Sequence, residues 1–74
     1  MDTEYLNAIK EAINNCSWLQ SEKRDKLISM LGLEKENRLM RMIQDFYYRG
    51  VSALESIEML SPKFSYLTDE ELAS

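Results

Sequence analysis

Residues 34–50 of the chain read EKENRLMRMIQDFYYRG, and their spacing is typical of an amphipathic helix. Apolar side chains recur there at intervals of three and four residues, as on a buried helix face: Leu39, Met42, Ile43 and Phe46. Met40 and Tyr47 widen this arc to about 160°, and Tyr48 points almost opposite to it. We therefore predict a helix over about 34–49 that ends at Gly50. It is either a central core helix or one that offers part of its aromatic surface to a partner.

The residues before this stretch predict two more helices. From Tyr5 to Cys16 the apolar residues fall within one arc of a helical wheel, which predicts a helix over about 3–15 with Asp2 or Thr3 as its cap. A second helix is expected over about 18–31, with Ser17 or Ser21 as the capping residue. Two further expectations concern its end: Gly32 adopts a left-handed conformation there, and Leu33 folds back onto the helix.

The residues after Gly50 predict a helix over about 52–60 and a C-terminal segment over 63–74. Ser52 and Glu55 have the spacing of a capping box, and Pro62 is expected to end the helix just beyond residue 60. Four apolar residues are assigned to one face of this helix: Ala53, Leu54, Ile57 and Leu60. Thr68 and Glu71 repeat the capping-box spacing, so the last segment is an extension or a short fifth helix. Phe64, Tyr66 and Leu67 are expected to fold back over the other helices.

These patterns predict an all-α fold, a compact bundle of about four short helices with a C-terminal extension or short fifth helix. The chain of 74 residues is long enough for one domain, so residues 1–74 form a single helical domain. A chain of this size buries only about 60% of its unfolded surface, which leaves a marginal core.

The composition excludes several kinds of site. The chain has no histidine and one cysteine, Cys16, so it can form neither an internal disulfide nor a Cys–His nucleophile pair. A structural zinc site needs about four ligands, mainly Cys and His, and we expect no metal site. Gly32 and Gly50 stand alone, so no phosphate-binding loop is present. We predict no catalytic residue, no cofactor and no enzymatic activity.

Charge and hydropathy narrow the class of partner. The net charge is −4, and the residues outside 22–41 are strongly acidic, which argues against nucleic acid as the partner. Residues 24–43 still allow a weak helix-turn-helix interpretation with Gly32 in the turn. Its first recognition turn would place Glu34 and Glu36 against phosphates, which is unfavourable. We expect no membrane span and no secretion signal, and an intracellular, reducing, cytoplasmic location.

The surplus of arginine, tyrosine and other large side chains points to a protein partner, because these residue types are enriched at interaction hot spots. The predicted contact residues are Arg38, Arg41, Asp45, Tyr47, Tyr48, Arg49, Trp18 and Met59. The sequence thus favours a small non-catalytic protein-binding regulator, an adaptor or an inhibitor, that acts through the aromatic and arginine surface of residues 34–49. One alternative is a self-assembling structural homodimer that covers the wide apolar face of this helix. The other is a small helix-turn-helix-like DNA-binding regulator.

Overall fold

The computed structural model describes residues 1–74 and is built of helices alone, with no strand. The all-α prediction is therefore confirmed. In chain order the helices are α1 (Thr3–Asn14), α2 (Ser21–Ser29), α3 (Arg38–Tyr48), α4 (Ala53–Phe64) and α5 (Asp69–Ala73).

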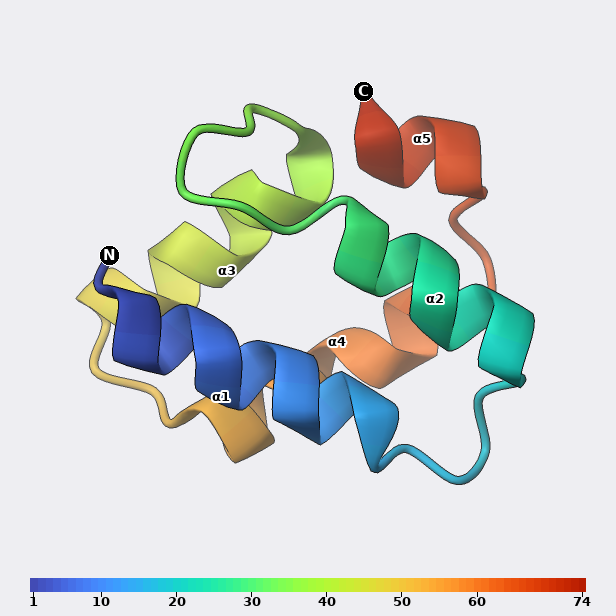
Figure 1. The fold of residues 1–74 in the computed structure, drawn as a ribbon, viewed down its shortest axis with the longest axis horizontal. Coiled ribbons are helices and arrows are strands. Elements are labelled where there is room, and N and C mark those ends of the chain that lie inside the picture. The colour runs from blue at the N-terminus through green and yellow to red at the C-terminus, as the bar shows by residue number, and fades with distance from the viewer.

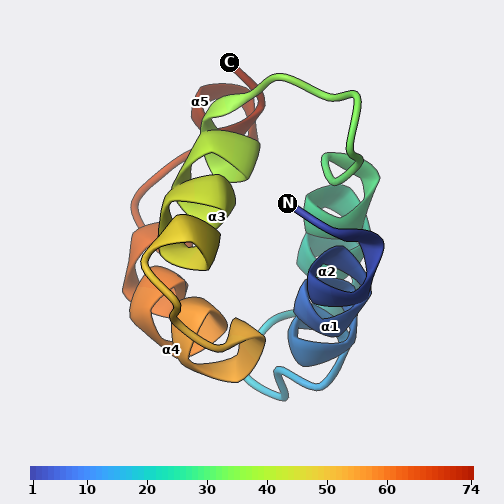
Figure 2. The ribbon, with the colours of Figure 1, turned by 90° about the vertical axis from the view of Figure 1, so that its left-hand side faces the viewer.

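The helices form two layers (Figures 1 and 2). One layer holds α1 and α2, and the other holds α3, α4 and α5. Between the layers α1 packs on α4, and within the second layer α3 contacts both α4 and α5. Apolar side chains from every helix meet in one core: Leu6, Ile9, Ile13, Cys16, Leu27, Leu31, Leu39, Met40, Ile43, Ile57, Leu60, Phe64 and Leu72. A single core serves the whole chain.

Side-chain caps set the beginnings of four helices, and three of these caps were predicted. The Asp2 carboxylate accepts from the Tyr5 amide at 2.8 Å. The Thr68 hydroxyl accepts from the Glu71 amide, and the Glu71 carboxylate accepts in return from the Thr68 amide. This reciprocal capping box is confirmed at α5. At α4 the Ser52 hydroxyl accepts from its helix, which is half of the predicted box.

Helix α3 begins at Arg38, four residues later than predicted. Asn37 is its cap, accepting from the Met40 amide at 2.8 Å, while its own amide group donates to the Met30 carbonyl at 2.8 Å. Asn37 thus joins the end of α2 to the beginning of α3 and satisfies backbone groups at both. The predicted left-handed cap at Gly32 is wrong, because only Gly50 has a positive φ, at 78°. Gly50 does end α3 as expected.

Helix α4 continues through Pro62 to Phe64, so the prediction of an end near residue 60 is wrong. Proline has no amide hydrogen for the carbonyl four residues earlier, that of Glu58. The Ser61 hydroxyl donates to this carbonyl instead, at 3.0 Å. The extra turn carries Phe64 into the core, where it is buried. A local side-chain hydrogen bond therefore allows the helix to pass the proline.

The inner face of α4 also differs from its prediction. Leu54 is exposed, and the fully buried polar residue on this helix is Ser56. Beyond α4, Leu67 packs against the core whereas Tyr66 stays exposed, so only part of this segment folds back. The ammonium group of Lys23 on α2 lies 2.5 Å from the Asp69 carboxylate, and this ion pair fastens α5 to α2.

Candidate functional site

Three tyrosines join the end of α3 to the beginning of α1. The Tyr47 ring packs edge-on against Tyr5, with ring centres 4.9 Å apart, and against Tyr48 at 5.3 Å. The Tyr5 hydroxyl donates to the Val51 carbonyl at 2.9 Å and accepts from the Ser56 hydroxyl at 2.7 Å. Tyr5 and Tyr47 are half-buried, and of these two only Tyr47 packs against the Tyr48 ring.

The Tyr47 hydroxyl also donates to the Asp2 carboxylate at 3.3 Å. The negative charge of Asp2 raises the pKa of Tyr47, because it disfavours the phenolate. Tyr48 itself is 75% exposed. Tyr48 thus points away from the buried arc, as its position on the helical wheel predicts. Tyr47, which was also a predicted contact residue, is half-buried and packs against the Tyr48 ring.

The exposed side of α3 carries the predicted arginines. We call Arg38, Arg41, Asp45, Tyr48 and Arg49 the α3 face; all five are exposed. Asp45 forms an ion pair with Arg49 at 3.2 Å but none with Arg41, although both lie four residues away. The Arg41 guanidinium instead donates to the Ser74 carbonyl at 3.2 Å. With three cations and one anion, the face is positively charged.

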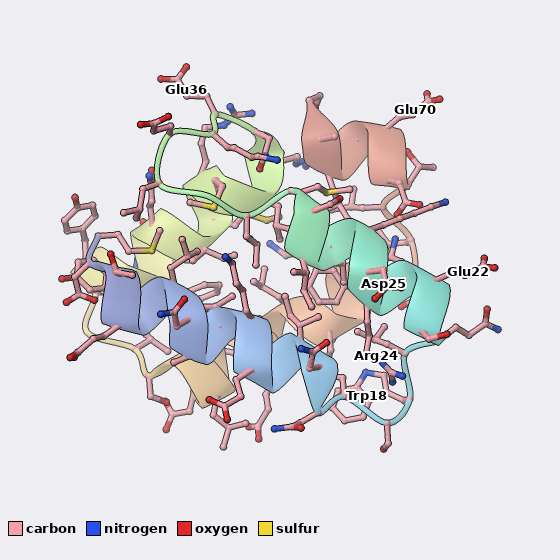
Figure 3. The ribbon with its side chains drawn as sticks, in the orientation of Figure 1. Trp18, Glu22, Arg24, Asp25, Glu36 and Glu70 are labelled. Carbon is pink, nitrogen blue, oxygen red and sulfur yellow. The ribbon has the colours of Figure 1, made fainter.

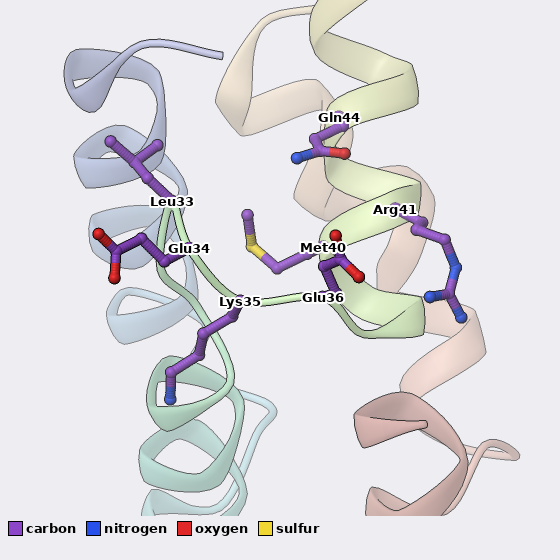
Figure 4. A pocket seen from close by; sticks show the side chains of 7 residues that line it. All are labelled: Leu33, Glu34, Lys35, Glu36, Met40, Arg41 and Gln44. Carbon is purple, nitrogen blue, oxygen red and sulfur yellow. The ribbon is translucent and has the colours of Figure 1, made fainter.

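A groove lies beside the α3 face, between α3 and the segment that joins it to α2 (Figure 4). Its volume is about 470 Å³, and its lining residues are Leu33, Glu34, Lys35, Glu36, Met40, Arg41 and Gln44. Met40, Gln44 and Tyr48 follow one another at intervals of four residues, so they form one row along α3. Gln44 lines the groove and Tyr48 lies one turn further along α3, so the ring is a neighbour of the groove and not part of its lining.

The groove is polar, with Leu33 and Met40 as its only apolar residues. The Lys35 ammonium donates to the Ser29 carbonyl, whereas Glu34 and Glu36 take part in no ion pair. Small-molecule sites are lined mainly by apolar side chains. This lining is better suited to polar side chains of a macromolecular partner. Sequence reasoning missed the groove because the segment was expected to be helical and Leu33 to be covered.

Trp18 lies far from the α3 face, in the turn between α1 and α2 (Figure 3). The predicted helix over 18–31 begins only at Ser21, and no serine caps it. Arg24 fixes this turn instead, donating to the carbonyls of Cys16 at 2.9 Å and Leu19 at 2.8 Å. The Trp18 side chain in this turn is 61% exposed.

The structure thus divides the predicted contact residues among three places. Those of α3 come together, Trp18 is at the turn before α2, and Met59 is exposed on α4. The structure does not have the geometry of a helix-turn-helix motif, because residues 30–37 separate α2 from α3. Helix-turn-helix motifs use turns of about three to four residues. Residues 34–37, assigned to the start of a recognition helix, are not helical.

Other reactive groups do not gather into a site. No cluster of Cys, Asp and Glu residues has the arrangement of a metal site. Burial raises the pKa of the Cys16 thiol, which the charge of Arg24 partly opposes. Hydrogen bonds from Thr68 lower the pKa of Glu71 in the α5 cap. None of the five helices has the length and apolar character needed to cross a bilayer.

Comparison with protein family models, with curated proteins and with solved structures finds no match for this chain.

Proposed function

We propose that the protein is a small non-catalytic regulator, an adaptor or an inhibitor, that binds another protein through the α3 face and the groove beside it. The observation that carries the proposal is the 75% exposure of Tyr48, a large side chain supported from behind by Tyr47. Tyrosine and arginine are the residue types that dominate interaction hot spots. Tyr47 contacts one side of the ring, and most of the ring stays open to a partner.

The charges of the α3 face indicate an acidic partner surface. Arg38, Arg41 and Arg49 outnumber Asp45 there, although the chain as a whole carries a net charge of −4. Arg41 is tethered only to a backbone carbonyl and Arg49 only to Asp45, in an exposed ion pair. Exposed pairs of this kind contribute about 0.2–1 kcal/mol, so both arginines can exchange their contacts for a partner carboxylate at little cost.

A pull-down with the tagged protein from lysate of its native host, with and without nuclease, tests the proposal. Arg41→Glu, Arg49→Glu and Tyr48→Ala should each weaken capture of a specific protein by about tenfold, while circular dichroism shows the helices retained. A matched control for the two charge reversals is Lys10→Glu on α1, away from the α3 face. Unchanged capture by all three α3 variants contradicts the proposal, and loss of every partner on nuclease treatment supports the DNA-binding alternative.

A further inference from the structure

A second unpartnered surface lies on the outer side of α4. Two large apolar side chains are exposed there, Leu54 at 63% and Met59 at 56%, and Tyr66, two residues beyond the end of α4, is 67% exposed. The opposite side of the same helix is buried against the core through Ile57, Leu60 and Phe64. α4 therefore buries one side against its own core and also exposes apolar side chains on its solvent side.

Two glutamates lie between these apolar residues. On a helical wheel Leu54 and Met59 are about 140° apart, and Glu55 and Glu58 fall within that arc. Neither glutamate is in an ion pair. The nearest cation along this helix, Lys63, directs its ammonium group to the Met42 sulfur on α3, at 4.0 Å. We call Leu54, Glu55, Glu58, Met59 and Tyr66 the α4 face: apolar at its margins and negative along its middle.

We infer that the α4 face docks a basic amphipathic helix of a partner protein. Such a helix would place lysine or arginine against Glu55 and Glu58 and cover the apolar margins with its own apolar residues. A second copy of the α4 face is a poor occupant, because it would bring four glutamates together in a contact that excludes water. The α3 face of another copy offers arginines, but Tyr48 is its only large exposed apolar side chain.

The inference does not depend on the function proposed for the α3 face. If both hold, the protein carries two docking surfaces of opposite charge in the same layer of the fold, one on α3 and one on α4 (Figure 2). Such a chain can join an acidic partner surface to a basic helix. Two docking surfaces would then favour the role of an adaptor over that of an inhibitor.

A designed peptide provides the probe. It is a peptide of about 18 residues with leucine along one face of a helical wheel and lysine elsewhere, so that it can form an amphipathic helix on the protein surface. A second peptide replaces each lysine by glutamate and keeps the leucines. Each is titrated into the isotopically labelled full chain and followed by amide chemical shifts. The lysine peptide should shift amides of α4 and of residues 65–67, and the glutamate peptide should not.

Variants separate the charge from the apolar contacts. Glu55→Lys with Glu58→Lys should weaken binding of the lysine peptide roughly tenfold. Glu11→Lys with Glu22→Lys changes the net charge equally on the other layer and should have little effect. Leu54→Gln and Met59→Gln should each weaken binding roughly fivefold, and both sites are exposed, so the fold should persist.

Three results would overturn the inference. The lysine peptide could shift amides elsewhere and leave α4 unchanged. It could bind the Glu55→Lys, Glu58→Lys variant as tightly as the parent protein. The α4 amides could also shift with protein concentration in the absence of peptide, which would identify a second copy as the occupant. Arg41→Glu and Tyr48→Ala should leave peptide binding intact, so failure of the α3 proposal is distinguishable.

Discussion

The hydroxyl of Tyr5 should be worth a large part of the stability of this protein. It donates to the Val51 carbonyl and accepts from Ser56, whose side chain is fully buried. Tyr5→Phe removes the first bond and leaves the Ser56 hydroxyl without its partner. A lost hydrogen bond costs about 1 kcal/mol and an unsatisfied buried group a further 1–2 kcal/mol. We expect the free energy of unfolding to fall by about 2–3 kcal/mol, from a total of about 4–11 kcal/mol for a chain of this length.

Urea denaturation followed by circular dichroism measures this loss. Ser56→Ala in the Tyr5→Phe background removes the orphaned hydroxyl, so the double variant should be more stable than the sum of the single effects by about 1 kcal/mol. Tyr66→Phe makes the same chemical change at an exposed ring and should stay within about 0.5 kcal/mol of the parent. A Tyr5→Phe loss below about 0.5 kcal/mol, or strictly additive effects, would refute the role given to this hydroxyl.

Further predictions concern an ion pair and the two glycines. The hydrogen bond from Lys23, together with Lys26, lowers the pKa of Asp69, so these contacts stabilise the fold above the unfolded pKa and are lost as the pH falls below about 4. Asp69→Asn should therefore lower the free energy of unfolding by about 0.5–1 kcal/mol at neutral pH. It should also reduce the loss of stability between neutral and acidic pH, which urea titrations at several pH values measure. An unchanged loss of stability in acid contradicts this prediction. Gly50→Ala should destabilise by about 1–2 kcal/mol because of its positive φ. Gly32→Ala meets only the flexible Lys35 side chain and should change the melting temperature little; equal losses at both glycines would be inconsistent with these backbone conformations.

The helices that local patterns define well were predictable. In α1 the apolar arc is dense and Asp2 caps its first turn, so the predicted bounds differ from the observed ones by one residue. The helix boundaries that were predicted wrongly are set by side-chain hydrogen bonds to the backbone. Asn37 and Arg24 each bond to backbone carbonyls outside their own turn, and Ser61 replaces the hydrogen bond that Pro62 cannot make. Contacts of this kind form only in the folded structure, so they cannot be predicted from the helical periodicity of the sequence.

The candidate site was predictable in part for the same reason. The exposure of Tyr48 and Met59 follows from their positions outside the apolar arcs of their helices, and the structure agrees. The groove beside α3 was not foreseen, because it exists only where residues 33–36 leave the helical path. Leu54 was wrongly placed in the core, since Phe64, beyond the expected end of α4, completes the buried face instead.

The breadth of an apolar arc is therefore a weaker sign of a binding surface than the residues that fall outside it. α3 has a wide arc, but Leu39, Met40 and Ile43 are all buried, because α3 packs on both α4 and α5. Met42 and Phe46, on the same arc, are partly buried against the core, so the arc leaves little apolar surface for the homodimer alternative, which stays untested. What stays exposed is Tyr48 on α3, and Leu54 and Met59 on the far side of α4. These exposed side chains, rather than the breadth of the arc, are the residues on which the proposed partner contacts rest.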